Sequence, residues 1–139
     1  MKTICVIDGQ GGGIGSTIIK RLKERFGETV VILGVGTNAI ATAQMLKAAA
    51  NRGASGENAI VRTVSRVDVI VGPIGIAFAH AMMGEVTPVM AEAITGAAAK
   101  KVLLPLTQEN IAVVGVQALP LPRLIDLMLD EHFADWNPI

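Results

Sequence analysis

A glycine-rich segment near the N-terminus is the strongest candidate in this sequence for binding a ligand. Its sequence is Asp8-Gly9-Gln10-Gly11-Gly12-Gly13-Ile14-Gly15, and it lies between an apolar run at 4–7 and a helical pattern of apolar residues that includes Ile18. Glycine lets the backbone approach an anion, and a helix N-terminus offers free N–H groups and a partial positive charge. A strand, a glycine loop and a helix in this order therefore predict a phosphate cradle, which defines a class of ligand rather than a reaction.

The spacing of the glycines is G-x-x-x-G-x-G, formed by Gly9, Gly13 and Gly15. The dinucleotide fingerprint G-x-G-x-x-G does not fit, because it would need glycine at position 14 or 16. The observed spacing resembles the cofactor loop of the short-chain dehydrogenases over roughly residues 1–20. Those enzymes use a Tyr and Lys pair, and this chain has no tyrosine. Their chemistry is therefore excluded, while phosphate binding is not.

Other candidate residues come after the later predicted strands, since ligands of open α/β sheets bind beyond the carboxyl ends of the strands. The exit of the strand at 102–104 adds Pro105 and Gln108. Tight strand–helix packing also requires glycine, and helix capping also uses Thr and Asn, so both remain alternatives. The complete predicted ligand-binding set is Gly9, Gln10, Gly11, Gly12, Gly13, Gly15, Thr37, Asn38, Arg52 and Gly72.

The charged candidates are Asp8, Arg52 and Glu57. Asp8 could hold a ribose hydroxyl, an amine or Mg²⁺, or it could bind the N–H groups of its own loop. Arg52 could clamp an anion bidentately, and Glu57 could act as a base or a metal ligand. The alternative for the last two is a solvated loop with a helix cap. We expect a packed or interface role for His80 and a surface role for Glu85.

The residues after the second predicted strand narrow the nature of the ligand. An NAD site normally has an acidic residue there for the ribose hydroxyls, and NADP would need a nearby arginine. This chain has Gly34-Val35-Gly36-Thr37-Asn38 instead. A mononucleotide or a small phosphorylated or carboxylated metabolite is therefore favoured over NAD(P). The two histidines and Cys5 lack metal-ligand spacing, so we expect no structural zinc site.

Periodicity predicts a single domain over 1–139 in which strands alternate with helices. This alternation indicates a three-layer, Rossmann-like α/β sandwich with a mostly parallel sheet of about five strands. The link at 105–110 is too short for a parallel crossover, so the last two strands should form an antiparallel edge pair. The predicted strands are 3–7, 30–33, 68–71, 102–104 and 111–116; the predicted helices are 13–25, 38–50, 57–64, 74–83, 87–100 and 122–132, with a loop at 51–56.

Composition bounds the remaining possibilities. Hydrophobic residues make up 51% of the chain, while charged residues make up 17%, below the roughly 25% typical of soluble domains. We expect part of this apolar excess to lie in an interface of a homo-oligomer. A net charge of +0 and 3% aromatics argue against nucleic-acid binding. No uninterrupted apolar run reaches membrane-spanning length and no signal-peptide pattern occurs, so a cytoplasmic location is expected.

Taken over its whole length, the chain resembles a family of short bacterial proteins known only as a domain of unknown function. The resemblance implies no activity, so the roles above rest on the residues alone. The segments that carry it are Val6-Ile7-Asp8-Gly9-Gln10-Gly11-Gly12-Gly13-Ile14-Gly15, Gly36-Thr37-Asn38-Ala39, Asn51-Arg52-Gly53-Ala54, Gly56-Glu57-Asn58-Ala59-Ile60, Val71-Gly72-Pro73-Ile74-Gly75-Ile76 and Gly84-Glu85-Val86-Thr87-Pro88.

These residues support three hypotheses. The first is a binding protein for a nucleotide or small anionic metabolite, because no evident nucleophile, acid–base pair or redox site is present. The second is a small enzyme in which Asp8 and Glu57 act as acid–base or Mg²⁺-binding residues and Arg52 holds the anion. The third is an interaction subunit whose glycines serve packing only.

Overall fold

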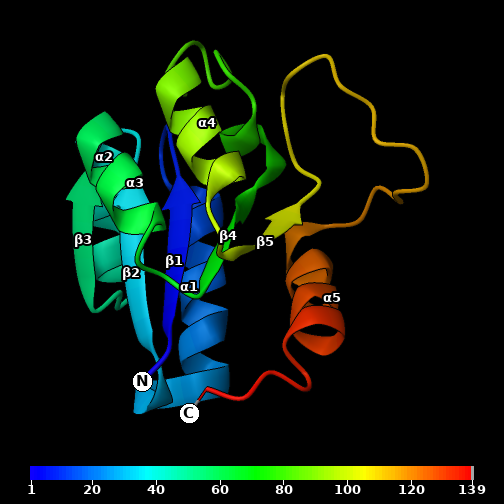
Figure 1. Ribbon diagram of the computed structural model, residues 1–139. Helices are drawn as coiled ribbons and strands as arrows, with labels where there is room; N and C mark the ends of the chain where they lie inside the picture. The colour runs from blue at the N-terminus through cyan, green and yellow to red at the C-terminus, as the bar shows by residue number, and fades with distance from the viewer. Residues whose placement is uncertain (139) are drawn as a thin grey trace.

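The computed structural model describes residues 1–138, which form one parallel five-stranded sheet with helices on both faces (Figure 1). The strand order is β3-β2-β1-β4-β5, and every pairing is parallel. The elements in chain order are β1 (Thr3–Asp8), α1 (Gly13–Phe26), η1 (Gly27–Thr29), β2 (Val31–Gly36), α2 (Ala39–Lys47), β3 (Arg52–Ser55), α3 (Glu57–Val64), β4 (Val69–Pro73), η2 (Ile74–Ala77), α4 (Pro88–Gly96), β5 (Lys100–Leu104) and α5 (Leu121–His132).

Strand β1 lies at the centre of the sheet and is buried on both faces. Its side chains alternate between two cores, since successive residues of a strand point to opposite faces. Ile4 and Val6 pack in a core with α1, α2 and α5, whereas Cys5 and Ile7 pack in a core with α3, η2 and α4. This double burial explains why β1 is an uninterrupted apolar run.

The order of the strands creates a topological switch point between β1 and β4. From β1 the chain moves outward to β2 and β3, and it then returns to the other side of β1 for β4 and β5. The loops that leave β1 and β4 consequently diverge at the carboxyl edge of the sheet. A crevice at such a point is where open α/β sheets bind ligands.

The predicted α/β class with five strands is confirmed, but the predicted antiparallel edge pair is wrong. The sheet is entirely parallel, and 111–116 is not a strand. This apolar, β-branched run lies in a projecting segment, 105–120, that leaves β5 and turns away from the sheet (Figure 1). Its composition resembles that of a strand, but it adopts no strand pairing in the described part of the chain.

The fifth strand is β3, within the segment expected to be a loop. It pairs with β2 from Leu33↔Arg52 to Gly36↔Ser55. All four residues of β3 are exposed because it is an edge strand, and this exposure accounts for its polar, glycine-containing sequence. The polar sequence of this segment therefore reflects the exposure of an edge strand, and it does not indicate a loop.

Three predicted helices are shorter than expected. The helix expected at 38–50 is α2, which ends at Lys47. The helix expected at 74–83 is reduced to the 3₁₀ helix η2, after which the chain turns through left-handed residues up to Gly84. Helix α4 begins as predicted, with the Thr87 hydroxyl accepting the N–H of Met90 at 3.1 Å, but it ends at Gly96 because β5 begins at Lys100. Across residues 1–138, no helix combines the length and the hydropathy of a membrane span.

Candidate functional site

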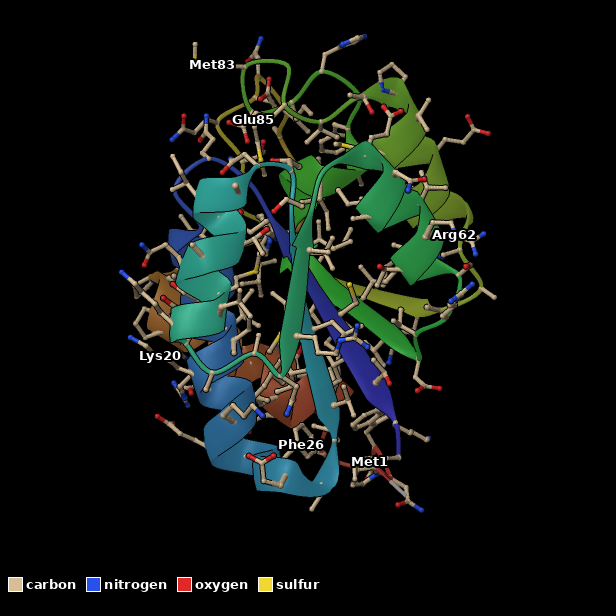
Figure 2. All side chains as sticks on the ribbon, turned by 90° about the vertical axis from the view of Figure 1, so that its left-hand side faces the viewer. Met1, Lys20, Phe26, Arg62, Met83 and Glu85 are labelled. Atoms are coloured by element: carbon tan, nitrogen blue, oxygen red, sulfur yellow. The ribbon has the colours of Figure 1, made fainter. Side chains whose placement is uncertain are left out.

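A cavity of about 630 Å³ lies at the switch point, between the loops that leave β1, β4 and β5. We call it the switch-point cavity. Figure 2 shows the carboxyl edge of the sheet at the top, with Met83 and Glu85 labelled there. The cavity is lined by Asp8, Gly9, Gln10, Gly11, Gly12, Gly13, Ile14, Pro73, Gly75, His80, Met82, Met83, Leu106, Thr107, Gln108 and Glu109.

The carboxylate of Asp8 holds the glycine loop to the start of α1. It is 4% exposed, and it accepts the N–H of Gly9 at 2.8 Å and the N–H of Gly15 at 2.7 Å. Because these donors belong to both ends of the loop, Asp8 fixes the path of the backbone between them.

Glu85 joins three segments that are far apart in the sequence. Its carboxylate accepts the Gln10 N–H at 2.8 Å, the Thr37 hydroxyl at 2.6 Å and the Asn38 side-chain amide at 2.8 Å. It thereby ties the β4–α4 loop to the glycine loop and to the β2–α2 turn. A carboxylate from elsewhere in the chain therefore lies against the residues after β2, where a dinucleotide enzyme presents its ribose-binding acid.

The glycines of the site fall into two classes. A Cβ on Gly9 would lie 2.5 Å from the Thr37 hydroxyl, one on Gly15 would lie 2.9 Å from Asp8, and one on Gly72 would lie 2.3 Å from the Ile7 carbonyl oxygen. Gly12 has φ 73° and its Cβ would meet Ala41 at 2.8 Å. Packing within the protein requires glycine at each of these positions.

Gly11 and Gly13 belong to the second class. A Cβ at either position would meet no protein atom within 4 Å, although both residues line the cavity. Among residues 1–138, the N–H groups of Gly9, Gly12 and Gly15 have acceptors, whereas those of Gly11 and Gly13 have none. Internal packing does not explain glycine at these two positions, but the close approach of a ligand to the backbone would.

The wall opposite the glycine loop is built from strained backbone. His80, Met82 and Met83 have φ values of 71°, 59° and 57°, in the left-handed region that residues with side chains rarely adopt. The Glu109 carboxylate accepts the Met82 N–H at 3.0 Å, and the Val86 carbonyl accepts the His80 N–H at 2.6 Å. Such strain persists only where the surrounding structure imposes it, and it clusters at binding sites.

The lining of the cavity combines polar and charged side chains with apolar surface. Amide, hydroxyl and imidazole groups come from Gln10, Thr107, Gln108 and His80, and apolar surface comes from Ile14, Leu106, Met82 and Met83. Lysine and arginine are missing from this lining. No group of three or more His, Cys, Asp or Glu residues suited to a metal ion occurs within residues 1–138.

The sequence-predicted site residues do not all meet at this cavity. The loop residues Gly9, Gln10, Gly11, Gly12 and Gly13 line it, as does the predicted catalytic candidate Asp8. Gly15 lies behind Asp8 and Gly72 lies within the sheet.

Thr37 and Asn38 face Glu85 instead of the cavity. The side chain of Asn38 also caps α2, by accepting the Ala41 N–H at 2.8 Å. Arg52 lies on the edge strand and lines a different groove. The Glu57 carboxylate accepts the hydroxyl of Thr87 at 2.6 Å, so it joins α3 to the start of α4.

Two residues with a place in the site were expected elsewhere. His80, expected to be packed or at an interface, is exposed in the single chain and lines the cavity, because the segment predicted to be a helix is a left-handed turn. Glu85, expected on the surface, is half-buried and bonded to the glycine loop. Gly84 beside Glu85 was the available signal, since a glycine next to an acid in an apolar segment indicates a turn that can present the acid.

Opposite pKa shifts distinguish the two carboxylates. Burial raises the pKa of Asp8 above its ordinary value of 3.8, and the nearby Glu85 charge adds to this, against the lowering effect of the backbone donors. Burial also tends to raise the pKa of Glu85, but the bonds from Thr37, Gln10 and Asn38 outweigh it, so this pKa lies below 4.5.

Because its pKa is raised on folding, Asp8 stabilises the fold at low pH, and this contribution is lost as pH rises through its folded pKa. Glu85 stabilises the fold above its unfolded pKa and loses this contribution as pH falls through its folded pKa.

The Glu85→Gln variant should lose more stability at pH 7 than at pH 3. The reason is that the charged carboxylate, which accepts three hydrogen bonds, is the form that stabilises the fold. Urea unfolding at the two pH values measures the difference. Carboxyl NMR should also show the pKa of Asp8 falling in this variant, whereas replacing exposed Glu92 by Gln should leave it unchanged. Equal losses at both pH values would contradict the role assigned to Glu85.

Comparison with known proteins identifies the family. The model of a family described as "Domain of unknown function (DUF3842)" matches residues 3–137, so the chain belongs to this family and the resemblance inferred from the sequence is confirmed. No curated protein matches the chain. One similar solved structure is the dodecameric FMN-dependent Ubix-like decarboxylase from Escherichia coli O157:H7, with 19% identity, 78% of this chain and 69% of that chain covered, and a TM-score of 0.46. A likeness at this level carries no argument about activity.

Proposed function

We propose that this member of the DUF3842 family binds a mononucleotide, or another small metabolite with an anionic group, in the switch-point cavity. The observation that carries the proposal is the pair Gly11 and Gly13, where the protein itself leaves room for a side chain and yet has none. Both residues line a cavity at the position where open α/β sheets bind their ligands.

The anionic group would bind to the N–H groups of Gly11 and Gly13 at the N-terminus of α1. This helix is 14 residues long, so its dipole and its first N–H groups favour an anion at this end. Asp8 contributes indirectly, by fixing the loop from behind. Its negative charge, together with that of Glu109 in the lining, favours one phosphate or carboxylate over a polyphosphate.

The remainder of the ligand would lie along the rest of the cavity. A volume of about 630 Å³ falls within the roughly 300–1,000 Å³ range of small-molecule sites. Gln10, His80 and Gln108 offer hydrogen bonds to hydroxyl or base groups, while Leu106 and Met82 offer apolar contact. A second nucleoside would have to occupy the place beyond β2 that Glu85 closes, which disfavours NAD(P).

A thermal-shift screen tests the proposal with AMP, GMP, UMP, ribose 5-phosphate, citrate and NAD, each with and without Mg²⁺. A ligand at 100 times its dissociation constant should add about 2.7 kcal/mol to the free energy of unfolding, raising the melting temperature by several degrees. The Gly13→Ala variant should fold as stably as the wild type and lose the shift, because its methyl group meets no protein atom but occupies space that the ligand needs.

Gly96→Ala is the matched control. Gly96 is also a helical glycine with open space around its Cβ position, and it lies at the end of α4, outside the lining of the cavity. This variant should keep the full shift. A screen without any shift, or a shift that Gly13→Ala retains, would contradict the proposal and favour the interaction-subunit hypothesis.

The arrangement gives less support to the small-enzyme hypothesis. That hypothesis requires Asp8, Arg52 and Glu57 to act on one ligand, but only Asp8 lines the switch-point cavity. Arg52 lines a groove on the edge of the sheet, and Glu57 is bonded to Thr87. A binding role agrees better with a cavity of backbone donors and dispersed polar side chains.

Self-association forms a second part of the proposal. The projecting segment exposes Ile111, Val113, Val114 and Val116, with Val114 98% exposed, and apolar surface of this kind favours burial against another subunit. We expect the Val114→Asp variant to sediment as a smaller species than the wild type at micromolar concentration. Asn58→Asp, which adds a charge on exposed α3, should sediment as the wild type does. A wild type that is already monomeric would contradict this part.

A further inference from the structure

A second groove, of about 400 Å³, lies on the face of the sheet that carries α3 and is separate from the switch-point cavity. Its floor consists of alternate residues of β2, which point to the same face: Val31, Leu33 and Val35. The register continues this apolar surface onto the edge strand, where Ala54 pairs with Val35. Helix α3 is eight residues long, and the groove lies between its last turn and the amino-terminal ends of β1 and β2, where Thr3 and Val31 line it.

Three arginines surround this apolar floor. Arg52 pairs with Leu33 in the register of β2 and β3. Arg62 belongs to the last turn of α3, and Arg66 lies just beyond the end of that helix. Figure 2 shows Arg62 on the side of the sheet opposite to Lys20. All three arginines line the groove and are exposed.

The positive charge of the groove is not neutralised by the protein. The ion pairs formed within residues 1–138 involve other cations, namely Arg21, Lys23 and His132. The nearby carboxylate of Asp68 accepts the Thr3 N–H at 2.8 Å and does not pair with an arginine. Unpaired guanidinium groups beside an apolar floor provide two kinds of contact to one ligand.

We infer that this groove binds a small amphipathic anion, a molecule with an apolar body and a carboxylate or phosphate head. The head pairs with the guanidinium groups, whose planar donors match both anions bidentately. The body lies on Val31, Leu33 and Ala54. The guanidinium groups select the anionic head, and the apolar floor selects the apolar body. An alcohol with the same apolar body lacks the charge, and inorganic phosphate lacks the body, so we expect both to bind more weakly.

A ¹⁵N NMR titration with octanoate, 1-octanol and inorganic phosphate tests this inference directly. Octanoate should shift the amides of Leu33, Ala54 and Arg62 and bind at least about tenfold more tightly than either of the other two probes. A tenfold effect corresponds to the loss of one charge-assisted contact. The double variant R62Q/R66Q should weaken octanoate binding by at least about tenfold, and Ala54→Phe should block it by filling the floor.

The double variant K20Q/K47Q is the matched control, since it removes two exposed cations on α1 and α2, the helices of the opposite face. It should bind octanoate as the wild type does. Equal affinity for octanoate and octanol, unchanged affinity in R62Q/R66Q, or shifts confined to the glycine loop would overturn the inference. Because the amides that report on this groove are not those of the switch-point cavity, its failure is distinguishable from failure of the proposed function.

Discussion

Replacing Gly72 by alanine is expected to destabilise the fold more than any other single methyl group added at the site. Gly72 lies in β4, directly beside the central strand, and its Cβ would stand 2.3 Å from the backbone carbonyl oxygen of Ile7. That oxygen cannot move without separating β1 from β4, which pair through Val6↔Val71. We expect the free energy of unfolding to fall by about 3 kcal/mol or more, which is the upper end of the range for overpacked cores. Urea unfolding measures this loss.

The control for this variant is Gly75→Ala, three residues along the chain. Its Cβ would lie 3.5 Å from the nearest atom, the Thr107 hydroxyl, which is ordinary contact. This variant should change the free energy of unfolding by less than about 1 kcal/mol. If Gly72→Ala were as stable as Gly75→Ala, Gly72 would not be a packing glycine.

The second large effect is expected for Asp8→Asn, which keeps the shape of the side chain and removes the charge. An amide has one acceptor oxygen, so it cannot accept from Gly9 on one side and from Gly15 on the other, as the carboxylate does. An orphaned buried donor costs about 1–3 kcal/mol, and we expect a loss in that range from the stability of the fold.

Asp8→Asn should also weaken ligand binding in the switch-point cavity, although Asp8 is not proposed to hold the anion. The loop that presents Gly11 and Gly13 is fixed by this carboxylate at both ends, so its loss should loosen the loop. Replacing Asp130, an exposed acid on α5, by Asn should alter neither property. Asp8→Asn with wild-type stability would show that the loop holds its shape without the carboxylate.

Much of the fold was predictable because local patterns determine it. The apolar runs of β1 and β4 have one interpretation each, since a buried parallel strand must be apolar on both faces. The glycine loop marks the start of α1, although its role has two interpretations. The pattern was misleading at the two exposed segments. Strand β3 is too exposed to look like a strand, and the run 111–116 is β-branched without having a strand to pair with.

The candidate site was less predictable, because it depends on contacts between segments distant in sequence. Nothing near Thr37 in the sequence indicates that Glu85, 48 positions later, bonds to its hydroxyl. The distinction between Gly11 and Gly12 is likewise invisible in the sequence, since only their surroundings show that one faces open space and the other faces Ala41.

Binding of an anionic ligand to the backbone of Gly11 and Gly13 is best tested by a ¹⁵N NMR titration of the wild type and of Gly13→Ala with AMP and with ribose 5-phosphate. We expect at least one of these probes to shift the amides of Gly11 and Gly13 at lower concentration than the amides of the groove lined by Arg52, Arg62 and Arg66. Gly13→Ala should abolish the shifts of the loop amides. If neither probe shifts the loop amides at millimolar concentration, or if the shifts persist in Gly13→Ala, the glycine loop does not bind the phosphate of these probes and the proposed function is wrong.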